Sequence, residues 1–494
     1  MIKLCRGKRP GADAAPFGDK VRGQGELTQV IAFVPETSSQ PTRSSLSDII
    51  LASGRNVQAV LAGRSLSDSL AATPLPVRAG TQAVAFHAMR RLGLARAIRD
   101  ILVRRPPSNA LFDAVLLVSL ALLDTALEFA DESTSDAPAR RTMPVYAVHT
   151  VVDQAVEAVA GVHKIRPYKG LLNGTLRSFI RERSAILAQA RQDPVAVFNF
   201  PGWWIRQVRR AYPKHWETLL YAANEPGPMA LRINRRRATV ADVLQDLDAA
   251  GVEARQVDDH AIIVATPRPV QALPGFEDGC WSVQDMSAQK AAMLLPVEAG
   301  MRVLDACAAP GGKTAHLLER ADIDLLALDA DPQRLERVGQ NLDRLRLDRA
   351  HVNLQCADAA DVPAWWDGRP FDAVLADVPC TASGVVRRHP DIRWLRRESD
   401  VAKTAALQRR IVDALWPTVR PGGHLLYATC SIFPQEGEQQ AVQFATRHRD
   451  AVRLPAPGQL LPLSSEEAMG DGFFYALFAK KADSSGGAVQ VPLA

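Results

Sequence analysis

The stretch from Val303 to Thr314, V-L-D-A-C-A-A-P-G-G-K-T, restricts the possible fold more than any other part of the chain. Its apolar start suits a buried parallel strand, Pro310-Gly311-Gly312 breaks the strand, and an amphipathic helix pattern begins at Lys313. A strand, glycine turn and helix in this order leave unpaired N–H groups at the helix N-terminus, beside the carboxyl end of the strand. The sequence therefore predicts that a small ligand binds at this turn.

Three ligands compete for the turn. A nucleoside triphosphate requires G-x-x-x-x-G-K-[ST], and Gly312-Lys313-Thr314 matches its end, but Cys307 stands where the first glycine belongs. A dinucleotide requires G-x-G-x-x-G, which the turn lacks. The remaining candidate is S-adenosylmethionine, whose ribose needs a carboxylate after the next strand. Asp329 follows the apolar run from Ile323 to Leu328 and fits that role, although a plain loop carboxylate is the alternative.

Strand and helix patterns alternate from Met293 onward. The predicted strands are Arg302 to Ala306, Asp324 to Leu328, Val352 to Cys356, Phe371 to Ala376, Gly423 to Ala428 and Gly472 to Ala479. Such alternation predicts a doubly wound parallel sheet, in which ligands bind beyond the carboxyl ends of the strands. The polar residues that follow these strands are Asp305, Asp329, Asp358, Asp377 and Cys430. Unrelated strand caps are the alternative, but their gathering at one rim favours a functional site.

The length of 494 residues predicts about three domains. Upstream of the alternating region, apolar residues recur at helical spacing and the run Ala114 to Leu127 is apolar nearly all round, which predicts a helical bundle. A strand from Met229, a helix capped by Thr239 and Asp242, and a strand from Ala261 predict a small split βαβ module. The expected segments are a flexible leader at 1–42, the bundle at 43–190, the small α/β module at 191–292, the parallel-sheet domain at 293–482 and a flexible tail at 483–494.

The formal net charge of +5 permits nucleic-acid binding. Arg235, Arg236 and Arg237 make one edge of the small module strongly positive, for which phosphates are the expected counter-charge. A basic face of the bundle, from His163 to Arg183, is either a solvated face or an RNA contact. The longest apolar run is far shorter than the ~20 residues of a membrane span, so we expect a cytoplasmic protein. The six cysteines include no C-x-x-C pair, so we expect no metal site.

Two cysteines follow predicted strands, Cys380 and Cys430. If the strands are neighbours, both thiols face one pocket. A thiolate that adds to carbon 6 of cytosine makes carbon 5 able to take a methyl group, and a second base then removes the carbon 5 proton so that the thiol can leave. Asp377 would hold N3 of the base. The alternative, that a cysteine is only a small buried hydrophobe, is preferred for Cys280 and Cys356.

Several segments closely resemble the bacterial RNA (cytosine-C5) methyltransferases of the RsmB type, also called Sun or Fmu. They are Asp305 to Thr314, Asp377 to Gly384 and Ala428 to Ser431. Arg387 to Arg397 and Val283 to Asp285 resemble segments particular to this ribosomal RNA branch. The resemblance extends from about residue 45 to the end of the chain.

The resemblance implies a multidomain fold. Its parts are an N-terminal all-α bundle similar to the antitermination factor NusB, a small α/β module, and a C-terminal α/β Rossmann-like class I methyltransferase domain. The implied reaction is S-adenosylmethionine-dependent methylation of carbon 5 of a cytidine in 16S ribosomal RNA. The implied partner is small-subunit ribosomal RNA before or early in assembly, and we expect a monomer.

The resemblance also assigns roles to residues. Cys430 is the implied nucleophile, Cys380 assists release, and Asp377 lies between cofactor and base. The implied cofactor site comprises Cys307, Ala308, Ala309, Pro310, Gly311, Gly312, Lys313, Asp329, Asp358 and Asp377. RNA contacts are expected from Arg235, Arg236, Arg237, Arg387, Arg388 and His389. The family usually continues Pro-Glu-Glu-Asn where this chain has Pro434-Gln435-Glu436-Gly437, which leaves the role of these side chains open.

Two other functional classes stay open. A non-catalytic RNA-binding assembly factor would bind RNA without methyl transfer, against which the intact pair Cys380 and Cys430 argues. An ATP-dependent enzyme would use Gly312-Lys313-Thr314, against which Cys307 argues.

Overall fold

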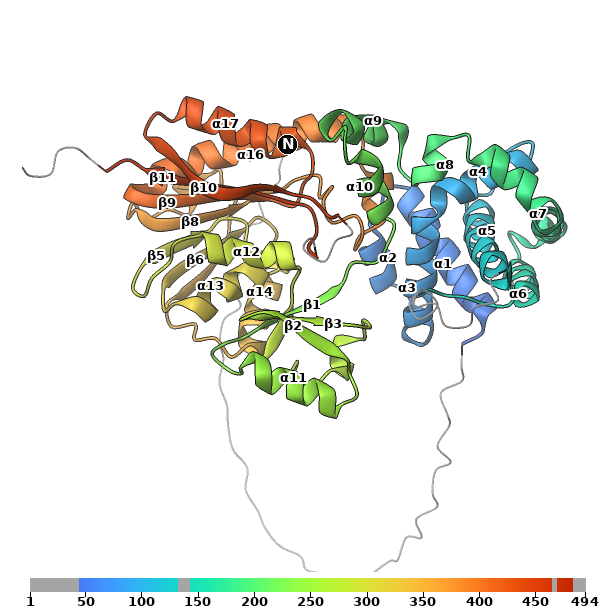
Figure 1. The fold of residues 1–494 in the computed structure, drawn as a ribbon, viewed down its shortest axis with the longest axis horizontal. Helices are drawn as coiled ribbons and strands as arrows, with labels where there is room; N and C mark the ends of the chain where they lie inside the picture. The colour runs from blue at the N-terminus through green and yellow to red at the C-terminus, as the bar shows by residue number, and fades with distance from the viewer. Residues whose placement is uncertain (1–43, 132–142, 464–468, 483–494) are drawn as a thin grey trace, which may run out of the picture. The chain divides into compact units, whose positions relative to one another are not determined.

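The computed structural model describes residues 44–131, 143–463 and 469–482 (Figure 1). The predicted leader at 1–42 and tail at 483–494 lie outside these described ranges.

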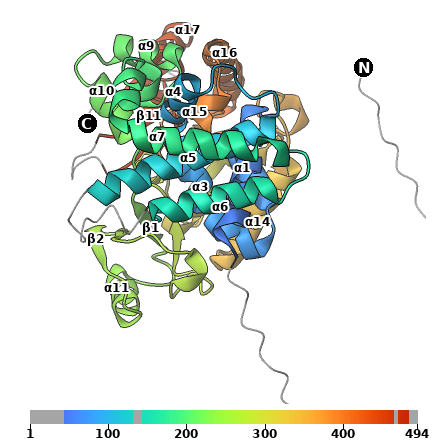
Figure 2. The same ribbon diagram turned by 90° about the vertical axis from the view of Figure 1, so that its right-hand side faces the viewer.

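The first described region is entirely helical, as predicted. Its helices are α1 (Leu46–Leu61), α2 (Leu66–Ala71), α3 (Leu75–Arg90), α4 (Leu92–Leu102), α5 (Ala110–Asp131), α6 (Val148–Ala160) and α7 (Lys169–Ala190). Helix α1 begins after Ser45, whose side chain accepts a hydrogen bond from the Asp48 N–H. Helix α5 packs against α1, α3, α4, α6 and α7, and Figure 2 shows it flanked by α6 and α7.

Helix α5 contains the most apolar stretch of the described residues. Residues Ala110–Ala130 are long and apolar enough to cross a membrane by composition, but 78% of the most apolar window is buried inside the bundle. A helix that is apolar all round is expected at the centre of a helical domain. The packing therefore accounts for its hydropathy.

The small module follows the short helices α8 (Pro194–Phe198), α9 (Gly202–Ala211) and α10 (Trp216–Ala222). It contains α11 (Val240–Ala249), capped as predicted by Thr239 and Asp242. Its strands are β1 (Met229–Ile233), β2 (Ala254–Asp258), β3 (Ala261–Val264) and β4 (Trp281–Val283). They pair antiparallel in the order β2-β3-β1-β4. Helix α11 joins β1 to β2, and these two strands run in the same direction with β3 between them, which confirms the expected split βαβ module. The prediction lacked β2 and β4, which are too short or too polar to give an apolar pattern.

The C-terminal domain is a seven-stranded sheet in the order β10-β11-β9-β8-β5-β6-β7. Its strands are β5 (Arg302–Asp305), β6 (Asp324–Asp329), β7 (Val352–Cys356), β8 (Phe371–Asp377), β9 (Val419–Thr429), β10 (Ala451–Leu460) and β11 (Phe473–Lys480). Strands β5 to β9 run parallel as predicted, but β11 runs in the opposite direction and pairs antiparallel with both β9 and β10. Strand β10 was not predicted because Pro455, Pro457 and Gly458 interrupt its pattern, which an edge strand tolerates.

Helices cover both faces of this sheet, which confirms the doubly wound architecture (Figure 1). Helices α12 (Met286–Leu294), α13 (Gly312–Arg320) and α14 (Pro332–Arg344) pack on one face. Helices α16 (Glu398–Leu415) and α17 (Glu438–Arg447) pack on the other. The connection from β7 to β8 is an exception to the predicted alternation, since it holds only a 3₁₀ turn, Val362–Ala364.

The segment from Arg387 to Arg397, which contains α15 (Ile392–Leu395), joins the catalytic sheet to the helical bundle. Asp391 accepts a hydrogen bond from the Leu66 N–H at 2.8 Å, and the Arg387 carbonyl accepts one from Arg90 at 2.8 Å. Arg393 is fully buried beneath the short helices that follow the bundle. The segment that resembles a family-specific motif thus carries contacts between domains.

Candidate active site

The order β9-β8-β5-β6-β7 places the predicted polar residues at the carboxyl ends of adjacent parallel strands. Asp305 ends β5, Asp329 ends β6, Asp377 ends β8, and Cys430 follows β9. Asp305 and Asp329 are buried, whereas Asp377 is partly exposed. The prediction that these residues share one rim of the sheet is confirmed.

The glycine turn after β5 is compact. Gly311 has φ of +95°, and a Cβ there would lie 3.0 Å from the Val338 Cα, so the turn suits only glycine at this position. Asp329 secures the turn, since its Oδ2 accepts a hydrogen bond from the Ala309 N–H at 3.1 Å. Its Oδ1 accepts the Asp331 N–H at 3.0 Å. A carboxylate has about four lone-pair sites, so two remain for the ribose hydroxyls of the expected cofactor.

Asp305 supplies a test of whether the turn fits S-adenosylmethionine. Its Oδ2 accepts the Thr314 hydroxyl at 2.7 Å, but its buried Oδ1 has no hydrogen-bond partner among the described residues. Burial raises the pKa of Asp305 to about 7, against the opposing hydrogen bond from Thr314. An unpaired buried acceptor at a ligand turn is explained by a donor or cation that the ligand supplies. The ammonium group of the amino-acid end of S-adenosylmethionine has that chemistry, so the residues fit the cofactor.

Lys313 links the turn to the neighbouring strand β8. Its Nζ lies 2.7 Å from Asp377 Oδ2 and 5.3 Å from the centre of the Phe473 ring. Burial acts to lower the pKa of Lys313, but the charge and hydrogen bond of Asp377 outweigh it and raise the pKa. Lys313 is therefore held as a cation. The sequence placed it only in the cofactor loop, whereas the structure also pairs it with Asp377.

The two thiols meet as predicted from the strand order. Cys380 Sγ and Cys430 Sγ are 3.3 Å apart, although the residues are far apart in sequence. The hydrogen bond with Cys430, burial and the nearby Glu436 raise the pKa of Cys380 well above its ordinary value. Cys380 is thus held as a thiol.

The Gly384 N–H donates to the Cys430 carbonyl at 2.9 Å, and a Cβ at Gly384 would collide with the Gly472 carbonyl, so this close approach requires glycine.

Glu436 was not predicted as a site residue, yet it is fully buried and contacts the residues that follow both cysteines. The available signal was its place six residues after Cys430, where the family also has an acidic residue. The sequence could not show that its carboxylate bonds residues next to both thiols, because its partners come from three separate segments.

Other predicted site residues lie further out. Asp358, expected at the adenine, is exposed and pairs with Arg410 at 3.0 Å. Cys356 is exposed rather than buried, because β7 is the edge strand of the sheet, so the expectation of a buried hydrophobe is wrong there. Cys280 is half-buried.

The expected RNA contacts fall into two groups. Arg235, Arg236 and Arg237 are exposed at the turn after β1, where Arg236 pairs with Asp322 at 2.7 Å. His389 is also exposed. Arg387 and Arg388 instead point at carboxylates: Arg388 pairs with Asp285 at 2.7 Å and Asp471 at 2.5 Å, and Arg387 lies 3.6 Å from Asp471. These two arginines have structural partners, and their contact with RNA stays a prediction.

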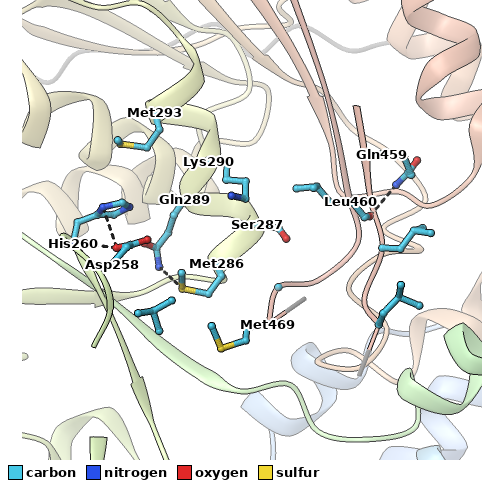
Figure 3. Close-up of a pocket in the computed structure, with 14 residues that line it drawn as sticks. Asp258, His260, Met286, Ser287, Gln289, Lys290, Met293, Gln459, Leu460 and Met469 are labelled. Atoms are coloured by element: carbon cyan, nitrogen blue, oxygen red, sulfur yellow. Dashed lines mark hydrogen bonds and ion pairs between the residues drawn. The ribbon is translucent and has the colours of Figure 1, made fainter. Parts of the chain in front are cut away.

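A cavity of about 650 Å³ lies beside the site rather than in it. Figure 3 shows its labelled lining from the small module, α12 and β10, including His260, Met286, Lys290 and Gln459. The two thiols and the residues of the glycine turn do not line it. One lining residue reaches the site, since Gln459 Nε2 donates to the Ser431 carbonyl at 3.0 Å. The reactive groups of the rim, not the size of this cavity, therefore identify the candidate active site.

Comparison with known proteins agrees with this geometry. The family model described as 16S rRNA methyltransferase RsmB/F matches residues 291–479, and the RsmF/B-like ferredoxin-like domain matches residues 200–271. Ribosomal RNA small subunit methyltransferase B of Vibrio cholerae serotype O1 is 40% identical over 439 residues, covering 86% of this chain and 95% of that relative. The protein of the same name from Serratia proteamaculans is 42% identical, covering 67% of this chain and 78% of the relative.

Two crystal structures share the fold. The structure of PH0851 aligns with a TM-score of 0.69 and 23% identity, covering 88% of this chain and 99% of that protein. A methyltransferase homolog protein from Pyrococcus horikoshii aligns with a TM-score of 0.50 and 26% identity, covering 58% of this chain and 97% of that protein.

Proposed function

Because this chain belongs to the RsmB/F family of 16S rRNA methyltransferases, we propose that it methylates carbon 5 of a cytidine in that RNA. The observation that carries the proposal is the pair of thiols 3.3 Å apart, beside the ion pair of Lys313 and Asp377. Paired thiols at the strand ends suit covalent activation of a weak carbon nucleophile.

The cofactor is S-adenosylmethionine, and when bound it supplies an electrophilic methyl group. The chain's own residues would hold it at the glycine turn from Cys307 to Lys313. Asp329 has free lone pairs for the ribose hydroxyls, and the unpaired Asp305 Oδ1 suits the ammonium group. Asp358, exposed after β7, would contact the adenine side.

Cys430 is proposed as the nucleophile. The two thiols share a hydrogen bond, and the raised pKa of Cys380 keeps a proton on that sulfur, so we assign the nucleophilic role to the other sulfur of the pair. Its addition forms a sulfur bond to carbon 6 and moves electron density toward carbon 5. A proton shared by Asp377 and N3 holds the base as the ring gains negative charge, and the Lys313 cation stabilises that charge.

In release, the carbon 5 proton is removed, its bonding electrons re-form the ring double bond, and the Cys430 sulfur leaves carbon 6 with its electron pair; the proton ends on the sulfur pair of Cys380 and Cys430. Cys380 is the second titratable group in contact with Cys430 Sγ, so we assign it the assisting role in release. Substitution of Cys430 should therefore block addition to the base, whereas substitution of Cys380 should slow release.

The RNA substrate must present its cytidine unstacked for the ring to reach both thiols. That requirement favours naked or early-assembling ribosomal RNA over a finished subunit, with the protein acting as a cytoplasmic monomer. We assign contact with flanking phosphates to Arg235 and Arg237, because both are exposed cations.

The test is transfer of labelled methyl from S-adenosylmethionine to unmodified 16S ribosomal RNA, with transfer RNA and DNA as competitors. Label should appear as 5-methylcytidine with the intact protein and be absent with Cys430→Ala, while cofactor binding persists in both. Bound cofactor without label in any nucleic acid would instead support a non-catalytic assembly factor.

A further inference from the structure

Glu436 is a buried carboxylate that the reaction described above does not use. It ends the 3₁₀ turn Pro434–Glu436, after the Cys430 loop, and its side chain is fully buried. Its oxygens accept hydrogen bonds from Thr381 N at 2.8 Å, Thr381 Oγ1 at 2.5 Å, Ser431 Oγ at 2.6 Å, Thr404 Oγ1 at 2.5 Å and Gln408 Nε2 at 3.2 Å. One carboxylate thus collects donors from three segments of the chain.

Two of these donors are sequence neighbours of the thiols. Thr381 directly follows Cys380 and bonds Glu436 through both its backbone N–H and its hydroxyl. Ser431 directly follows Cys430, and its hydroxyl donates to Glu436 Oε2. The Thr381 hydroxyl donates to the same oxygen. The loops after β8 and β9 are therefore tied to the same side chain.

The remaining donors anchor the carboxylate to helix α16. Thr404 and Gln408 lie one turn apart on this helix, and both bond Glu436 Oε1. Gln408 Nε2 also donates to the Pro379 carbonyl at 2.9 Å, so the residues on both sides of Cys380 are held. The position of the Cys380 loop is thereby set against a rigid element.

Burial of the Glu436 carboxylate without a counter-ion costs free energy of folding, which calls for a functional explanation. Within the described part of the chain, no lysine, arginine or histidine forms an ion pair with Glu436, and its donors are all neutral. A buried charge without a counter-ion is less stable than an apolar side chain of similar volume. Its charge also acts on the site, because Glu436 is one of the groups that raise the pKa of Cys380.

We propose that Glu436 is a positioning residue that holds Cys380 and Cys430 in register for the release step of the reaction. This inference rests on the proposed function, because it assumes that both thiols act on one base. Glu436 touches neither the base nor the cofactor loop in this assignment. It acts through Thr381 and Ser431.

The decisive variant is Glu436→Gln, with Glu438→Gln as the matched control. Glutamine keeps the size of the side chain but turns one acceptor oxygen into a donor, and the Thr381 N–H cannot reorient to accept it. Glu438 lies two residues away, is half-exposed and pairs with Arg453 outside the site. We expect kcat to fall about 100-fold in Glu436→Gln, as for a small misplacement of reacting groups. The KM for S-adenosylmethionine should stay within about twofold of the wild type.

A second measurement tests the separation of the two thiols and does not depend on methyl transfer. The full-length protein is equilibrated with reduced and oxidised glutathione, in which two protein thiols reduce one oxidised glutathione to two reduced molecules and form the Cys380–Cys430 disulfide. Mass spectrometry of the linked peptides gives the equilibrium constant. Glu436→Gln should lower this constant at least about tenfold, because the thiols lose their fixed separation.

Ser431→Ala serves if Glu436→Gln does not fold. It keeps the carboxylate and removes one of its five donors, together with the contacts of the Ser431 hydroxyl with Ser383 Oγ and the Phe433 N–H, so we expect both effects in the same direction but smaller. A wild-type disulfide equilibrium in the variants overturns the positioning role, even where activity falls with stability. A wild-type protein that forms the disulfide but methylates no RNA overturns the proposed function instead, and the glutathione measurement then still tests the positioning.

Discussion

Lys313 Nζ and Asp377 Oδ2 lie 2.7 Å apart, so an ion pair joins the cofactor turn after β5 to the catalytic end of β8. Both side chains are mostly withdrawn from water, with exposed fractions of 14% and 26%. A charge pair in such a place orients both groups and makes each depend on the other.

Lys313→Met should therefore lower the rate of methyl transfer by roughly 100-fold or more, because the site loses the cation that stabilises negative charge on the base. Labelled methyl transfer checks this, with cofactor affinity measured by calorimetry in parallel. Lys403→Met is the control, since Lys403 is exposed and its ion pair within the described residues is with Asp400, one turn away on α16. Equal activity of both variants would contradict a role for the ion pair in the chemistry.

Cys380→Ala should accumulate a covalent complex of protein and RNA, because addition by Cys430 remains and assisted release is lost. Denaturing gels of protein with unmodified ribosomal RNA and cofactor measure the complex. Cys356→Ala, an exposed cysteine of the edge strand, should behave as wild type. If Cys380→Ala instead forms no complex, the roles of the two thiols are reversed.

Asp305→Asn should change how stability depends on pH. The pKa of Asp305 is raised from 3.8 to about 7, mainly by burial. Between these values the unfolded chain has lost the proton and the folded chain keeps it, so stability falls as pH rises from about 4 to 7, by on the order of 4 kcal/mol. Asparagine does not titrate and should remove this fall. Melting temperatures of the cofactor-free proteins from pH 5 to 8 check it, and parallel curves would contradict the raised pKa.

The rim of the sheet was predictable because each residue there follows an apolar run, and parallel strands end at one edge. Asp305, Asp329, Asp377 and Cys430 could be placed from that rule alone. Glu436 could not, because its burial depends on Thr381, Thr404 and Gln408, and no local pattern brings these segments together.

Charge patterns were less informative than apolar patterns. Arg387 and Arg388 look like a phosphate-binding pair in sequence, but Asp285 and Asp471, far away in sequence, occupy them. Strand β10 was missed for a related reason. Its pairing with β11 outweighs the weak strand tendency of Pro455 and Pro457, and tertiary pairing of this kind leaves no local signal.

Arg235→Ala with Arg237→Ala should weaken RNA binding without changing which RNA is preferred. Both residues are exposed, and among the described residues neither side chain forms a hydrogen bond or an ion pair. If each contacts one phosphate, the slope of log affinity against log salt should fall by about 0.7 to 0.9 per residue. Filter binding at several salt concentrations checks this, and an unchanged slope would place the RNA elsewhere on the surface.

Arg393→Met should loosen the junction between the helical bundle and the catalytic domain. The guanidinium of Arg393 is fully buried, lies 4.0 Å from the centre of the Phe200 ring and donates to the Asn199, Ala223 and Val386 carbonyls. Methionine leaves these carbonyls without a donor, at a cost of about 1–3 kcal/mol for each unsatisfied group.

The expected outcome is a lower melting temperature, by roughly 5 °C or more, and earlier proteolytic separation of the helical region. Arg409→Met is the matched control, because Arg409 is exposed on α16 and has no partner within the described residues. Because the segment from Arg387 to Arg397 follows the Cys380 loop, and Arg396 donates to the Thr381 carbonyl at 2.9 Å, the loosened junction should also slow release. A variant that melts early but methylates at the wild-type rate would show that the junction stabilises the protein without acting on the thiols.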